Sequence, residues 1–154
     1  MFPTGDFLQG EVAVGITVML INIGIHAFVM GLIGWVTHHT TLAVQAAHAW
    51  IQLVLVTWAV VSILTAAHLI AIMVWAVTYY MVDIVPDSHD TFYFAFANYT
   101  TLGYGDIMPV KRWRLLGPMT AMNGMLLFGW SAAVIFDVLR TITRVIPEPS
   151  DTPE

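Results

Sequence analysis

Long apolar stretches dominate the pattern of hydrophobic and polar positions along the chain. Val12–Val36 and Ile51–Met81 contain no Asp, Glu, Lys or Arg, and Leu115–Val138 contains one acidic residue. Crossing the hydrocarbon core of a bilayer takes about 20 helical residues at about 1.5 Å each. All three stretches are long enough, so the pattern predicts three membrane-spanning helices.

Polar segments separate these stretches. Thr37–Thr41 is predicted to be the turn after the first span. Leu42–Val82 has no Gly, Pro or formal charge, but one helix of that length would be about twice as long as the hydrocarbon core is thick. The part before Ile51 is therefore expected at the interface. The polar segment Asp83–Asp90 follows, and Pro86 is expected to end the second span.

A short apolar segment precedes the third span. Thr91–Thr100 has too few residues to cross a bilayer, and the glycine-containing loop Thr101–Gly105 follows it directly. An apolar segment of this length beside true spans is typical of a re-entrant helix. The fold class is therefore an all-α membrane protein with three transmembrane helices plus one re-entrant helix and its loop.

Composition supports the membrane class and excludes several functions. Apolar residues make up 58% of the chain and charged residues 10%, against roughly a quarter charged in soluble proteins. The net charge is −5 and the basic residues form no large cluster, so no nucleic-acid partner is expected. There is no Cys and no catalytic constellation, so we expect neither an enzyme nor a cofactor. The N-terminus lacks the basic residues of a signal peptide, so the first helix is expected in the mature protein.

The loop Thr101-Leu102-Gly103-Tyr104-Gly105 carries the chemistry. Irregular backbone at membrane depth is tolerated only where protein buries it or where it lines water. Carbonyl oxygens of such a loop can replace the hydration shell of a cation, and glycine reaches backbone conformations that strain other residues.

The segment from about Asp90 to Phe136 resembles the pore region of tetrameric potassium channels, particularly small bacterial ones. Asp90–Asp106, with Thr-Leu-Gly-Tyr-Gly-Asp at its end, aligns without gaps to the pore helix and filter of that family. The resemblance implies a homotetramer in the cell membrane that conducts K⁺ across the lipid bilayer. It also implies that the Thr101 hydroxyl and the backbone carbonyls of the filter bind K⁺, with filter residues Thr101, Leu102, Gly103, Tyr104 and Gly105.

The same resemblance assigns supporting roles. It implies that Tyr93 and Phe94 form an aromatic cuff, with Thr100 and Asp106 also supporting the filter. The inner-helix hinge and cavity positions would be Gly124, Phe128 and Gly129.

Two positions depart from the family pattern. Leu102 replaces the usual Val, which leaves the carbonyl unchanged. Ala97 stands where some bacterial channels carry a Glu paired with the filter Asp, so Asp106 is expected to bond to the Tyr93 hydroxyl instead.

The resemblance also divides the chain. Residues 1–41 would be an N-terminal transmembrane helix and turn, 42–144 the pore domain, and 145–154 an acidic tail. Within the pore domain we expect an outer helix at about 42–83, a pore helix at about 90–100, the filter at 101–105 and an inner helix at about 115–144.

The filter's direction would place the C-terminus in the cytoplasm and the N-terminus outside. The positive-inside rule gives no support, because three basic residues would lie outside (Lys111, Arg112, Arg114) and two inside (Arg140, Arg144).

Two histidines lie within predicted spans. His26 and His68 are expected to be neutral and hydrogen-bonded, with Asn22 and Thr65 as their nearest polar neighbours, and pH sensing is the alternative. For His38, His39 and His48, a solvated turn is favoured over a metal site.

Two other functions stay open at this point. One is a poorly selective cation channel, and Tyr104 favours potassium over it. The other is an accessory membrane subunit without conduction of its own.

Overall fold

The computed structural model describes residues 5–41 and 49–143, and within them it is all-helical. Three long helices are α1 (Gly5–Thr41), α2 (Ala49–Met81) and α4 (Leu116–Thr143). The short helix α3 (Thr91–Tyr99) follows the 3-10 turn η2 (Ser88–Asp90), and the second 3-10 turn η3 (Lys111–Trp113) precedes α4.

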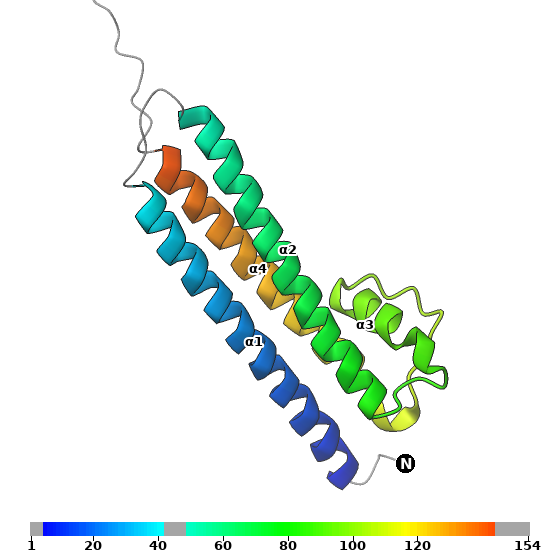
Figure 1. Cartoon of the computed structure of the whole chain (residues 1–154). Coiled ribbons are helices and arrows are strands. Elements are labelled where there is room, and N and C mark those ends of the chain that lie inside the picture. Colours follow the sequence, from blue (N-terminus) through cyan, green and yellow to red (C-terminus); the bar gives the residue numbers. More distant parts are fainter. Residues whose placement is uncertain (1–4, 42–48, 144–154) are drawn as a thin grey trace, which may run out of the picture.

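The long helices lie side by side, with α1 and α4 running in one direction and α2 in the other (Figure 1). Helix α1 packs on both α2 and α4, and α3 packs on α2 and α4 near one end of the bundle. Three helical segments are long and apolar enough to span a membrane: Leu8–Thr37, Leu53–Met81 and Lys111–Thr141. The predicted fold class of three spans and a short extra helix is therefore confirmed.

The predicted turn at Thr37–Thr41 is wrong, because α1 continues through Thr41. The Thr37 hydroxyl donates to the Ile33 carbonyl at 2.8 Å, so the polar side chain is satisfied by its own helix and does not end it. Residues 42–48 between α1 and α2, which include His48, lie outside the described residues, as do Arg144 and the acidic tail at 145–154. The side chains of His38 and His39 are not described either.

Pro86 does not end α2, which stops earlier, at Met81. Asp83 takes a left-handed conformation with φ 49°. The Ile84 amide donates to the Tyr79 carbonyl at 3.1 Å and the Asp83 amide to the Tyr80 carbonyl at 3.3 Å. This is a Schellman cap, a pattern that usually employs glycine at the left-handed position.

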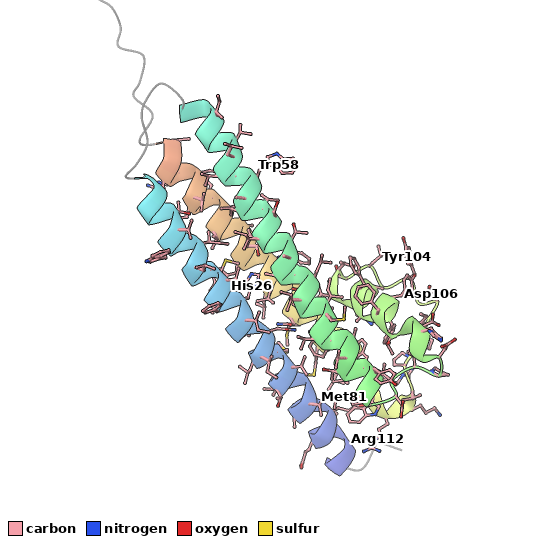
Figure 2. The ribbon with its side chains drawn as sticks, viewed as in Figure 1. His26, Trp58, Met81, Tyr104, Asp106 and Arg112 are labelled. Carbon is pink, nitrogen blue, oxygen red and sulfur yellow. The ribbon has the colours of Figure 1, made fainter. Side chains whose placement is uncertain are left out.

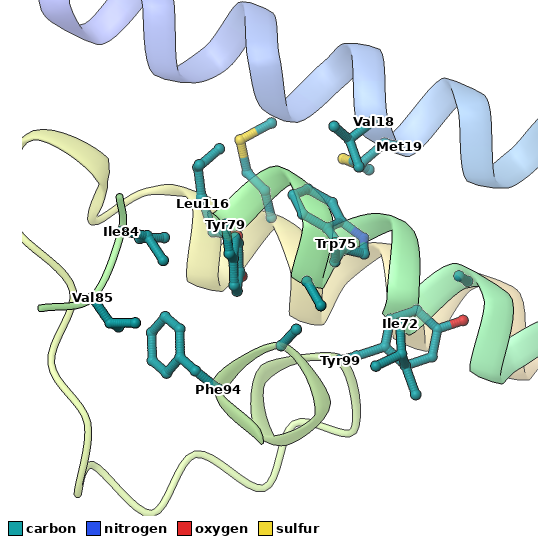
Figure 3. Packing of buried hydrophobic residues seen from close by; sticks show 14 of the residues in the cluster. Val18, Met19, Ile72, Trp75, Tyr79, Ile84, Val85, Phe94, Tyr99 and Leu116 are labelled. Atoms are coloured by element: carbon teal, nitrogen blue, oxygen red, sulfur yellow. The ribbon is translucent and has the colours of Figure 1, made fainter. Parts of the chain in front are cut away.

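The main core lies where α3 meets the bundle (Figure 3). Trp75 and Tyr79 of α2 and Tyr99 of α3 are each 0% exposed. Since lipid tails are as apolar as these side chains, packing and interhelical hydrogen bonds must hold the helices together. One such bond runs from the Asn22 amide to Asn123 Oδ1 at 3.1 Å, and Trp75 Nε1 donates to the same oxygen at 3.0 Å. Asn123 thereby ties α1, α2 and α4 to one point.

Candidate functional site

Helix α3 has one face against the bundle and one face exposed. Phe94 and Tyr99 are buried, whereas Phe92, Tyr93 and Phe96 on the other face are each about two-fifths exposed. Asp90 occupies the N-cap position without a side-chain cap bond. The acidic cap lies earlier: Asp87 Oδ1 accepts the His89 amide at 3.0 Å within η2.

The loop after α3 alternates in backbone handedness. Thr101, Gly103 and Gly105 have φ of 60°, 49° and 76°, whereas Leu102 and Tyr104 do not take positive φ. The Leu102 amide donates to the Ala97 carbonyl at 2.9 Å, which anchors the loop to the last turn of α3. Gly103 and Gly105 both take left-handed backbone conformations, as predicted for the glycines of this loop. Thr101 is also left-handed, but it is not a glycine, so the sequence did not predict its conformation.

Asp106 lies at the far end of this loop, next to Tyr104 in Figure 2. The Tyr93 hydroxyl donates to Asp106 Oδ2 at 2.8 Å, so the predicted bond is present. The other carboxylate oxygen, Oδ1, accepts the Ile107 amide at 3.1 Å. Because the Tyr93 hydroxyl donates to this carboxylate, the pKa of Tyr93 is raised above its ordinary value. The bond joins the first half of α3 to the end of the loop.

Within one chain, the side chains of Phe94 and Thr100 contact α2 and α3 respectively. The Phe94 ring packs on Tyr79 of α2, with 5.4 Å between ring centroids, so within one chain its main partner is the bundle core. The Thr100 hydroxyl donates back to the Phe96 carbonyl at 2.9 Å. A cavity of about 280 Å³ lies between α3, the loop and the start of α4, and Phe94 and Tyr104 are among the residues that line it.

Gly124 lies directly against the end of α3. A Cβ atom added there would overlap the Tyr99 carbonyl oxygen and lie 3.0 Å from the carbonyl carbon. Four residues on, the Phe128 ring is 5.5 Å from the Tyr99 ring, while a Cβ on Gly129 would meet nothing within 4 Å. Of the predicted inner-helix positions, Gly124 thus has a packing role in addition to the hinge role expected from the sequence.

Residues 67–141 match a family model described as ion channel. By this match, residues 67–141 belong to an ion-channel family. Comparisons with curated proteins and with solved structures find no match. The matched residues cover the C-terminal half of α2 from residue 67, all of α3, the loop and nearly all of α4, so the family match and the candidate site coincide. An ion channel acts on ions and resides in lipid, which agrees with the three long apolar helices. Helix α1 lies outside the matched region.

The structure contains a network of hydrogen-bonded polar side chains that the sequence analysis did not predict. His26 and His68 do not bond to Asn22 and Thr65, because Asn22 bonds to Asn123 and the Thr65 hydroxyl donates to the Val61 carbonyl of its own helix. Both imidazoles instead contact Ser131 of α4, and His68 also contacts the Tyr99 hydroxyl. The two histidines are hydrogen-bonded as predicted, but their partners were wrong, since helix pairing decides which polar residues meet.

Proposed function

We propose that this chain is one subunit of a homotetrameric, potassium-selective channel of the cell membrane, with residues 101–105 as its selectivity filter. The observation that carries the proposal is the alternation of backbone handedness along this loop. In an extended strand, successive carbonyls point to opposite sides. Where left- and right-handed residues alternate, successive amides turn to one side and the carbonyls to the other.

A row of carbonyls on one side is what a dehydrated cation requires. Four chains around one axis would offer rings of oxygens from Thr101, Leu102, Gly103 and Tyr104, with the Thr101 hydroxyl as a further ligand. Helix α3 ends directly before this row. Its C-terminal partial negative charge would favour a cation at the inner end of the filter.

Exposure of the loop supports assembly. Leu102 is 54% exposed and Tyr104 70% exposed in the single chain. Irregular backbone at membrane depth is not stable against lipid, because lipid tails cannot satisfy its polar groups, so another surface must cover the loop. Symmetric neighbours would do so, and the half-exposed aromatic face of α3 lies beside the loop to receive them. A homotetramer satisfies this need without a second type of chain.

The orientation of the chain follows from the same proposal. Helix α1 begins at the end of the bundle where η3 lies (Figure 1). If the outer mouth is formed at Asp106, the N-terminus is outside and the C-terminal end of α4 faces the cytoplasm.

Ion flux into liposomes tests this function. The purified chain should carry K⁺ in strong preference to Na⁺. Gly103→Ala should lose selectivity or conduction, because a Cβ at φ 49° strains the conformation on which the carbonyl row depends. Gly31→Ala is the matched control, since its Cβ would meet nothing within 4 Å and Gly31 lies in α1.

Three results would contradict the proposal. Equal K⁺ and Na⁺ flux in the wild type would indicate a poorly selective cation channel. No flux at all would indicate an accessory subunit. Unaltered selective flux in Gly103→Ala would show that the loop does not form the filter.

A further inference from the structure

A chain of hydrogen bonds crosses the middle of the bundle and joins all four helices. His26 Nε2 of α1 lies 3.0 Å from Ser131 Oγ of α4, and His68 Nε2 of α2 lies 3.0 Å from the same oxygen. His68 Nδ1 then lies 2.8 Å from the Tyr99 hydroxyl of α3. The two imidazole centroids are 5.1 Å apart. Figure 2 labels His26 near the centre of the bundle.

The side chains of this hydrogen-bond network are buried or half-buried among the helices. His26 is 1% exposed, Ser131 5% and Tyr99 0%, and His68 is half-buried with its ring stacked on Phe128 at 4.4 Å. The titratable groups that face His68 are His26 from α1 and Tyr99 from α3, while α4 presents Ser131 and Phe128. The sequence has no Asp, Glu, Lys or Arg from 12 to 82 or from 115 to 136. A proton that reaches the histidine pair therefore meets no countercharge from these segments. Both nitrogens of His68 are already hydrogen-bonded, so a proton on His68 must change those bonds.

Donor and acceptor counting shows what one proton changes. A neutral imidazole has one donor and one acceptor nitrogen. The distances fix no tautomer, so we take the arrangement in which His68 donates through Nε2 to Ser131. Its Nδ1 then accepts the Tyr99 hydroxyl proton, Ser131 donates to His26 Nε2, and the buried His26 Nδ1 has no recorded partner among the described residues. When His68 is protonated, both of its nitrogens are donors. Tyr99 must then accept from Nδ1, and its own proton loses the acceptor. Among the described residues, the structure records no second partner for this hydroxyl.

The position of Tyr99 makes this change matter. Tyr99 is the last residue of α3 and precedes Thr100 and the left-handed Thr101. Its carbonyl packs on Gly124 without space for a Cβ atom. A shift of the Tyr99 ring therefore acts where the loop begins.

We propose that His68 positions the end of α3 through Tyr99, and that protonation of the His26–His68 pair weakens this positioning and lowers conduction. The inference rests on the proposed function, conduction through residues 101–105. The histidine pair regulates the loop from a distance and binds no ion. His68 is accordingly a positioning residue, and a proton is the ligand of this buried site.

Ion flux measured against pH tests the inference. Wild-type channels in liposomes should lose flux as the pH falls from about 8 through about 5, the range in which unperturbed histidines titrate. One lost buried hydrogen bond corresponds to a change of roughly fivefold to a hundredfold. His68→Gln cannot titrate, so its flux should change less than about twofold over this range if the response is lost. Tyr99→Phe lacks the responding hydroxyl and should flatten the profile in the same way.

Controls separate this site from other titrating groups. His89→Gln carries the same substitution at an exposed histidine outside the network and should keep the wild-type profile. If His68→Gln does not assemble, Tyr99→Phe serves instead, because it removes the responding hydroxyl and leaves both histidines in place.

The inference fails if wild-type flux does not vary with pH, or if His68→Gln, or Tyr99→Phe in its place, keeps the full wild-type response. In both cases selective flux would persist and the proposed function would stand. No flux in the wild type at any pH would instead overturn the proposed function, and this inference with it.

Discussion

Gly124→Ala should destabilise the channel more than any other single methyl group added to its helices. The new Cβ would overlap the Tyr99 carbonyl oxygen and approach the carbonyl carbon to 3.0 Å and the Tyr99 ring to 3.3 Å. Non-bonded heavy atoms prefer about 3.5 Å or more, so the end of α3 has to move away from α4. Overpacking of this kind costs about 1–3 kcal/mol. The cost falls at the upper end because the contacted atoms are backbone.

Gly24→Ala provides the matched comparison. Gly24 also lies in the middle of a spanning helix, but its Cβ would meet nothing within 4 Å. Its only expected effect is the gain in helix propensity, up to about 1 kcal/mol. Unfolding of purified protein by denaturing detergent, followed by circular dichroism, would measure both. If Gly124→Ala proves as stable as Gly24→Ala, the close approach of α3 to α4 is not as described.

Three further predictions concern single contacts. Asn123→Leu removes the acceptor that Asn22 and Trp75 share, and an interhelical bond is worth about 0.6–1.7 kcal/mol, so the free energy of unfolding should fall by about 1–3 kcal/mol. A variant as stable as Met122→Leu, which changes an exposed neighbour, would refute this. Gly15→Ala should cost less than Gly124→Ala in the same unfolding assay, because its Cβ meets the flexible Met119 side chain rather than backbone, and a larger cost would contradict the packing of α1 on α4. Tyr93 has a raised pKa, so the stabilisation from its bond to Asp106 is complete below the ordinary tyrosine pKa of about 10 and is lost only as pH rises through the raised value. Wild-type flux should therefore decline at strongly alkaline pH, and a Tyr93→Phe variant with the same alkaline decline would exclude this bond as its cause.

Hydrophobic patterning predicted the spans because length and apolar content decide what crosses a bilayer. The ends of the helices were harder to predict. The polar residues at 37–41 indicated a turn, yet Thr37 bonds back to its own helix. Pro86 indicated the end of α2, yet a left-handed Asp83 ends the helix earlier, where sequence rules look for glycine.

In the candidate site, too, some features could be predicted from the sequence and others could not. Local backbone chemistry predicted the need for both loop glycines, and the resemblance to potassium channels predicted the bond between Tyr93 and Asp106. The convergence of His26, His68 and Ser131 could not be predicted, because it depends on how three helices are rotated against one another. A serine in the middle of an apolar helix was the one available signal. Within a bilayer such a hydroxyl bonds either to its own helix or across to a neighbour, and the sequence does not distinguish the two.

The reversal potential of purified channels in a planar bilayer, with K⁺ on one side and Na⁺ on the other, tests the carbonyl filter most directly. The proposed filter predicts a current that reverses far from zero, in the direction set by K⁺. A current that reverses near zero would contradict selective binding by residues 101–105.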